Sequence, residues 1–180
     1  VGGAGAYKEL GSEILEGIGP LLERKEFELN LAAGTRKEVA EYWKRNIEEG
    51  GLTKFLGKSI RIVHAMTKQK AFEQFEETLE KTDILWTKPS ELSFYAGLGI
   101  PIIIAPPIGS QEVQNRKWLL YVGAGLDQLS PIICHQWLAD FVRKGILAEA
   151  AMQGFVEIEK EGDKNIGELL GQVSGNRKIQ

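Results

Sequence analysis

The segment 82–115 constrains the fold of this chain more than any other. A short apolar run at 84–86 precedes a helical pattern at 91–98, and a second apolar run at 100–105 opens into a polar cluster. This order predicts a strand, a helix, a second strand and a loop that begins another helix. In an open parallel sheet, ligands bind outside the carboxyl ends of the strands. We therefore expect any chemistry of the protein to lie where these two strands end.

The same alternation of strand and helix patterns extends over most of the chain. Pro20 is expected to kink or divide the first helix. Strands are predicted at 27–33, 59–65, 84–86, 102–105 and 124–126, and helices at 7–25, 36–49, 70–81, 91–98, 111–121 and 131–145, with a weak helix at 166–173. We expect an α/β fold: one three-layer, Rossmann-like domain over residues 1–180, with a doubly wound parallel sheet and a partly ordered tail at 160–180.

Composition narrows the function classes. A chain of 180 residues fits one domain that can bury a core, and its net charge of −3 gives no electrostatic case for nucleic acid. The single cysteine, Cys134, can form neither an internal disulfide nor a cysteine cluster, and its apolar neighbours predict a buried side chain. We predict no metal site and no cofactor. No segment approaches the roughly 18 apolar residues of a membrane span.

A glycine-rich loop precedes the first predicted helix. A dinucleotide fingerprint would need a small residue at Lys8 and a carboxylate where the second strand ends at Gly34, and neither is present. Two interpretations of Gly3 and Gly5 stay open: a backbone that approaches a phosphate at a helix N-terminus, or a tight turn without a ligand. Because such loops normally follow a strand, we expect a first strand, or a whole domain with it, to precede Val1 in a longer protein.

The run from Gly99 to Asn115, with its Gly-x-Pro, Pro-Pro and Gln-Glu-x-x-Asn patterns, carries a resemblance to a known family. It resembles the C-terminal, donor-binding half of GT-B glycosyltransferases. The similar enzymes are the monogalactosyl- and monoglucosyldiacylglycerol synthases and the peptidoglycan N-acetylglucosaminyltransferase. The resemblance covers roughly residues 1–126, and it includes Gly34 after the second strand and the Thr-Lys-Pro run that ends at Pro89.

The resemblance implies a nucleotide-sugar site built from four segments. The resemblance places Gly2, Gly3 and Gly5 near the diphosphate or the acceptor domain, and His64, Ala65 and Met66 against the base, largely through backbone. The segment Pro89, Ser90, Glu91 and Leu92 would direct helix N-terminal amides at the phosphates. Gln111 and Glu112 would bind sugar hydroxyls, and Asn115 would brace their loop. Such amides can stabilise a leaving nucleoside diphosphate without a metal. An amide–carboxylate pair suits hydroxyl groups because it both donates and accepts hydrogen bonds.

Three departures from the family pattern bear on donor binding. Ser90 and Glu91 stand where the family has two glycines, and a glutamate beside a diphosphate is unfavourable unless it points away or Lys88 counters it. Phe94 stands where a count places the family's ribose-binding glutamate. Arg116 replaces an alanine. Altered or lost donor binding therefore stays open.

A structural interpretation stands beside each functional one. The Gln111–Asn115 cluster can instead be a solvated helix start, with Ser110 as the cap and Glu112 favouring the helix dipole. His64 can be a strand-end core histidine. Packing roles are predicted for His135, Trp86, Trp118 and Trp137.

The resemblance implies a domain that binds a nucleotide sugar, with UDP as the nucleotide, in an enzyme that transfers a hexose to an unknown acceptor. Direct displacement at the anomeric carbon needs a base, which the missing N-terminal acceptor domain or partner subunit would supply. No catalytic residue is assigned, and this chain alone is expected to be inactive. The alternatives are a non-catalytic or split partner half, a sugar-nucleotide epimerase-like domain and a Rossmann-type domain for another nucleotide. The expected location is cytoplasmic, with peripheral membrane contact through the missing half left open.

Overall fold

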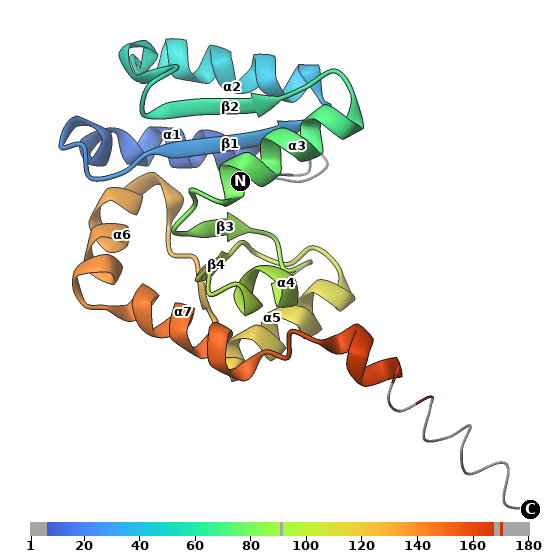
Figure 1. Ribbon diagram of the computed structural model, residues 1–180. Coiled ribbons are helices and arrows are strands. Elements are labelled where there is room, and N and C mark those ends of the chain that lie inside the picture. Colours follow the sequence, from blue (N-terminus) through green and yellow to red (C-terminus); the bar gives the residue numbers. More distant parts are fainter. Residues whose placement is uncertain (1–6, 91, 168–169, 171–180) are drawn as a thin grey trace, which may run out of the picture.

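The computed structural model describes residues 7–90, 92–167 and 170, in which helices alternate with parallel strands (Figure 1). The elements in chain order are α1 (Lys8–Glu23), β1 (Leu29–Gly34), α2 (Lys37–Glu49), a 3-10 turn (Thr53–Phe55), β2 (Ile60–His64), α3 (Lys68–Leu79), β3 (Leu85–Thr87), α4 (Leu92–Gly97), β4 (Ile102–Ile104), α5 (Ser110–Val122), β5 (Gly125–Asp127), a second 3-10 turn (Pro131–Ile133), α6 (Cys134–Arg143) and α7 (Ile146–Glu157). The predicted α/β class with parallel strands is confirmed.

The described strands form two short parallel sheets. β1 pairs with β2, and β3, β4 and β5 pair in that order. Within the described residues no strand joins β1 to β3, so the two sheets are not continuous. Helix α3 contacts both strands of the first sheet. Helix α2 also contacts both of these strands, and it packs against α1. The arrows of β1, β2 and β3 point the same way in Figure 1.

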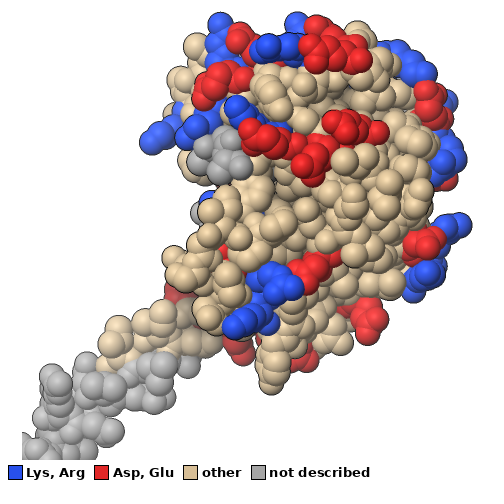
Figure 2. Space-filling view, turned by 180° about the vertical axis from the view of Figure 1, so that it is seen from behind, with Lys and Arg blue, Asp and Glu red and all other residues tan. Residues whose placement is uncertain are grey.

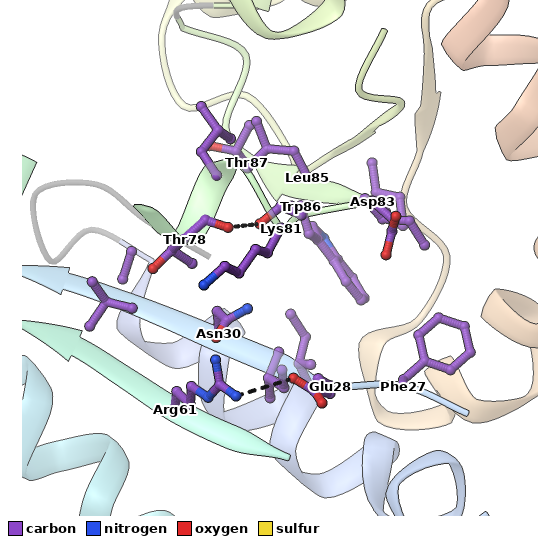
Figure 3. A pocket seen from close by; sticks show the side chains of 18 of the residues that line it. Phe27, Glu28, Asn30, Arg61, Thr78, Lys81, Asp83, Leu85, Trp86 and Thr87 are labelled. Atoms are coloured by element: carbon purple, nitrogen blue, oxygen red, sulfur yellow. Dashed lines mark hydrogen bonds and ion pairs between the residues drawn. The ribbon is translucent and has the colours of Figure 1, made fainter. Parts of the chain in front are cut away.

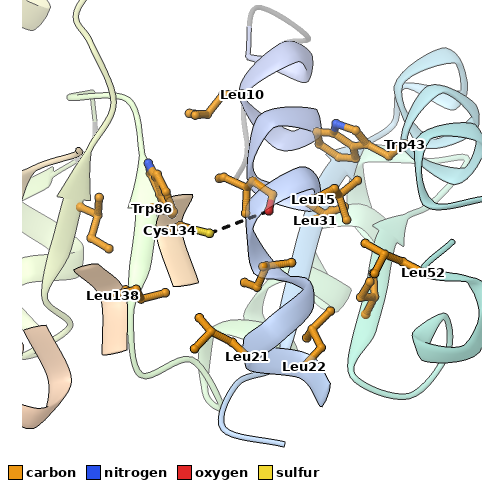
Figure 4. Packing of buried hydrophobic residues seen from close by; sticks show 14 of the residues in the cluster. Leu10, Leu15, Leu21, Leu22, Leu31, Trp43, Leu52, Trp86, Cys134 and Leu138 are labelled. Carbon is orange, nitrogen blue, oxygen red and sulfur yellow. Dashed lines mark hydrogen bonds between the residues drawn. The ribbon is translucent and has the colours of Figure 1, made fainter. Parts of the chain in front are cut away.

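Helix α1 lies at the centre of the larger hydrophobic core (Figure 4). Its apolar residues recur every three or four positions, so they cover a wide stripe of the helix. The buried members are Leu10, Gly11, Ile14, Leu15, Gly17, Ile18, Leu21 and Leu22. Trp43 of α2 lies on one side of α1 in Figure 4, and Trp86 and Cys134 lie on the other. A smaller hydrophobic core is formed mainly by buried residues of α4, β4 and α5.

The predicted strands and the helices up to 145 have counterparts whose ends differ from prediction by a few residues at most. Of the two expected effects of Pro20, division of the first helix does not occur: α1 continues to Glu23, and the Pro20 carbonyl accepts the Arg24 amide at 3.3 Å. Helix α7 had no predicted counterpart, although Leu147, Ala150 and Gly154 show a helical spacing. The weak helix expected at 166–173 lies mostly outside the described residues.

Cys134 is fully buried, as its apolar neighbours predicted. Burial raises the pKa of its thiol to about 12, so the thiol stays protonated at neutral pH. The side chain therefore acts as a small packing group beside α1. None of the described helices has the length and apolar character needed to cross a membrane.

We expect Gly17→Ala to destabilise the fold by about 1–3 kcal/mol, because α1 packs directly on the second 3-10 turn there. An added Cβ would lie 2.6 Å from the Ile132 carbonyl oxygen and would also overlap the Pro131 carbonyl, and neither backbone group can move freely. The matched control is Gly19→Ala in the same helix, where the nearest heavy atom is Leu52 Cδ2 at 3.7 Å. Better helix propensity should make that control up to about 1 kcal/mol more stable. Urea unfolding measures both values, and equal effects of the two substitutions would contradict the close packing at Gly17.

Candidate functional site

Two loops emerge side by side at the carboxyl ends of β3 and β4. Thr87 is in register with Ile104, so both strands end at the same level. The loop after β3 carries Lys88 and Ser90, and the loop after β4 leads through Pro106 into α5. This edge of a parallel sheet is where ligands bind in open α/β folds.

Asn115 connects the two loops. Its Nδ2 donates to the Pro89 carbonyl at 3.0 Å and reaches the Ser90 carbonyl at 3.4 Å. The side chain comes from the second turn of α5, so this helix holds the loop that follows β3. Because both contacts are to backbone oxygens, they fix the course of the loop whatever side chain stands at position 90.

Lys88, Glu112 and Asn115 form a cluster at these strand ends, called here the Glu112 cluster, and Glu112 is less exposed than Lys88. One carboxylate oxygen accepts the Ile108 amide at 2.8 Å, and the other lies 3.6 Å from Lys88 Nζ. The structural alternative in which Ser110 caps the helix is wrong in this detail: the N-cap is Gly109, which has no side chain, and Glu112 bonds back to the preceding loop instead. A carboxylate has about four lone-pair sites, so Glu112 can also accept from a ligand hydroxyl.

Tyr7 adds a hydroxyl to the cluster that sequence reasoning did not select. Its Oη donates to the Pro106 carbonyl at 2.8 Å, which ties the start of α1 to the loop after β4. Burial raises the pKa of Tyr7 above its usual value, and the negative charge of Glu112 raises it further. The available sequence signal was its position directly after the glycine-rich loop.

The segment His64, Ala65 and Met66 lies at the end of β2 and therefore belongs to the other sheet. The Ala65 amide donates to the Gly34 carbonyl at 3.0 Å, so it is already engaged. His64 Nε2 is buried and has no hydrogen-bond partner among the described residues. Met66 is 80% exposed. This segment and the Glu112 cluster both lie at the carboxyl ends of strands, but the strands belong to different sheets.

The loop after β3 only partly matches its expected role. The Ser90 amide donates to the Lys88 carbonyl at 2.8 Å, so it could meet a phosphate only after the loop rearranges. Leu92 is buried in the smaller core, where its side chain packs. The remaining residues expected here and in the glycine loop lie outside the described residues: Gly2, Gly3, Gly5 and Glu91.

A small cavity of about 240 Å³ adjoins the cluster and is lined by Ser90, Leu92, Ser93, Asn115 and Trp118. Trp118 was expected to pack, and it is 40% exposed at this cavity. The volume lies below the usual range of about 300–1,000 Å³ for small-molecule pockets, so it suits part of a ligand only. Gln111 is exposed nearby, and its side chain makes no hydrogen bond with another described residue.

Arg116 does not add a free cation to the site. Its Nε donates to Asp127 Oδ1 at 2.6 Å and a second nitrogen contacts Oδ2, which joins α5 to β5. The hydrogen bond to Asp127 raises the pKa of Arg116 above its usual value, so the guanidinium stays charged. Phe94, the other departure from the family pattern, is exposed on α4.

Charge and metal chemistry give little further indication of a ligand. Positive and negative side chains are interspersed over the face that Figure 2 shows. Among the residues that the structure describes, no three His, Cys, Asp or Glu side chains gather as metal ligands.

We expect Glu112→Gln to lower the pKa of Tyr7 while leaving it above the usual 10.0, because burial is the larger cause and remains. The amide oxygen of glutamine can still accept the Ile108 amide, so the loop should keep its course. Ultraviolet titration of tyrosinate measures the pKa, with Tyr7→Phe to identify the Tyr7 signal. Glu149→Gln, an exposed change on α7, is the control and should not shift it. An unchanged pKa in Glu112→Gln would show that the two groups do not interact.

Comparison with known proteins gives a family but no function. No curated protein and no solved structure matches the chain. A family model described as a domain of unknown function, DUF6938, matches residues 1–126. The matched region contains the whole Glu112 cluster and ends within β5. Because the match covers 126 of the 180 residues, the chain belongs to the DUF6938 family.

Proposed function

We propose that this domain binds a nucleotide sugar, with UDP as the nucleotide, and serves as the donor-binding half of a GT-B glycosyltransferase. The observation that carries the proposal is the cluster of Lys88, Glu112 and Asn115 at the carboxyl ends of β3 and β4, with Gln111 exposed beside it. These residue types lie at the sheet edge where open α/β folds bind ligands.

The side chains of the cluster suit a sugar joined to a diphosphate. Gln111 can donate to and accept from hydroxyls, and Glu112 can accept from them. Lys88 and Glu112 lie 3.6 Å apart, beyond the length of a strong charge-assisted hydrogen bond. Lys88 is therefore available to approach a phosphate, whose charge would attract it. The exposed Met66 at the end of β2 is a polarizable side chain that suits contact with the flat face of a base.

The proposal includes a finer fold and a reaction. The domain would be a three-layer, Rossmann-like half of the GT-B architecture, which the parallel strands and the helices beside them support. The reaction would be direct displacement at the anomeric carbon, in the cytoplasm, by an acceptor hydroxyl whose proton a base on another domain or subunit removes. This domain would position the donor and stabilise the leaving nucleoside diphosphate.

Calorimetric titration with UDP and with UDP-glucose tests the proposal. We expect saturable binding of both, and we expect Gln111→Ala to weaken UDP-glucose by about tenfold through the loss of a hydrogen bond to the sugar. The same substitution should leave UDP binding unchanged. Gln114→Ala is the matched control, because it is an exposed glutamine on the same helix, further from the strand ends.

Two results would contradict the proposal. The first is the absence of saturable binding at millimolar UDP and UDP-glucose, which would favour a half that only docks with a partner. The second is an equal effect of Gln111→Ala on both ligands, because the sugar would then not contact this residue.

A further inference from the structure

A wide cleft separates β1 from β3 (Figure 3). Its volume is about 2150 Å³, well above the usual range of about 300–1,000 Å³ for small-molecule pockets. Residues of β1, including Asn30 and Ala32, line one side, and Trp86 of β3 lines the other. Figure 3 shows the labelled side chains of Asn30 and Trp86 on opposite sides of this space.

The edge of β1 that faces the cleft carries backbone groups available for pairing. In a parallel pair, alternate residues direct their N–H and C=O groups to the same neighbouring strand. The Leu29 amide donates at 2.7 Å to the carbonyl of Ser59, the residue directly before β2, so the backbone groups of Leu29 and Leu31 face β2. Asn30 and Ala32 therefore direct their backbone groups into the cleft.

The edge of β3 repeats this arrangement from the other side. The Leu85 amide donates to the Pro101 carbonyl, and the Thr87 carbonyl accepts the Ala105 amide, so both residues face β4. Trp86 lies between them and directs its backbone N–H and C=O into the cleft. The unpaired N–H and C=O groups of an edge strand are a ready template for pairing with another strand, so two facing edges indicate a position for a strand between them.

The side chains that line the cleft indicate the amino-acid composition of that strand. Ile14 and Ile18 of α1 line one face. The other face is lined by α3, whose apolar residues include Phe72 and Phe75, yet no residue of α3 is buried. An amphipathic helix normally buries its apolar stripe. A strand beneath α3 would cover this stripe and would itself be covered on both faces, which requires mostly apolar side chains.

We propose that the cleft binds one β-strand, mostly apolar and parallel to β1 and β3, and that this strand leads into α1. It joins the two sheets in the order β2, β1, the added strand, β3, β4 and β5. A strand that enters a helix and then a parallel strand is a βαβ unit, and α1 followed by β1 supplies the helix and the second strand.

The start of α1 lies where such a strand would end. Tyr7, directly before α1, bonds the Pro106 carbonyl in the loop that follows β4. The amino end of α1 is therefore at the edge of the sheet where the parallel strands finish. A strand in the cleft that runs with its neighbours reaches its carboxyl end at this same edge.

Residue-resolved amide hydrogen exchange, measured by NMR on the 180-residue chain, tests the proposal. The probe is the soluble peptide acetyl-KVIVVTK-amide, whose apolar centre approximates the length of β1. The control peptide is acetyl-KVIPVTK-amide, because proline removes a donor from the ladder. We expect the first peptide to slow exchange at Asn30, Ala32 and Trp86 by at least about tenfold, saturably, with smaller changes at Leu31 and Leu85.

A fusion of the same KVIVVTK sequence directly ahead of Val1 tests which segment supplies the strand. It should slow exchange at Asn30, Ala32 and Trp86 without added peptide, whereas the fused proline sequence should not. Unchanged exchange with both the peptide and the fusion would overturn the proposal, as would equal slowing by the proline controls. Protection by the free peptide but not by the fusion would overturn the assignment of the strand to the segment that leads into α1. These outcomes do not depend on UDP binding.

Discussion

The burial of α1 on two sides is the interaction on which the rest of the structure depends. Between the described strands of the two sheets there is no pairing, so their relative position is set by packing rather than by a hydrogen-bond ladder. On one side, Trp43 lies against α1 and donates its indole N–H to the Lys8 carbonyl at 2.9 Å. On the other, Cys134 packs against the helix and His135 Nδ1 lies 3.0 Å from the Gly17 carbonyl oxygen. Losing either contact surface would free one sheet from the other.

The candidate site depends on the same helix. Tyr7 begins the described chain just before α1, and its bond to Pro106 connects the helix to the loop after β4. From there Glu112 and Asn115 fix the two strand-end loops through backbone contacts. The proposed strand would end at this edge as well. The two sheets would then be one continuous sheet, with the candidate site at the carboxyl ends of its strands. Lys88 and Ser90 line the cleft at this edge, so the strand that fills the cleft would end beside the proposed ligand site.

Local patterns predicted most of the fold, because periodicity reports which face of an element is buried. In α2, for example, Val39, Trp43 and Ile47 recur at four-residue intervals, and these are the residues that the helix buries. The same reasoning could not predict that Asn115 bonds Pro89, since those residues are 26 positions apart and meet only when two strands end in register. The alternative in which Ser110 caps this helix came from its residue type, whereas the helix begins one residue earlier and Glu112 bonds the preceding loop.

The most direct test of the account is to map UDP-glucose on the isotope-labelled chain by amide chemical shifts. If the strand ends of β3 and β4 form the donor site, the shifts that saturate together should centre on Ser90, Gln111, Glu112 and Asn115, and the Arg116–Asp127 contact should stay unchanged. Saturating shifts confined to other parts of the chain, or none at millimolar ligand, would contradict the assignment of this cluster as the functional site.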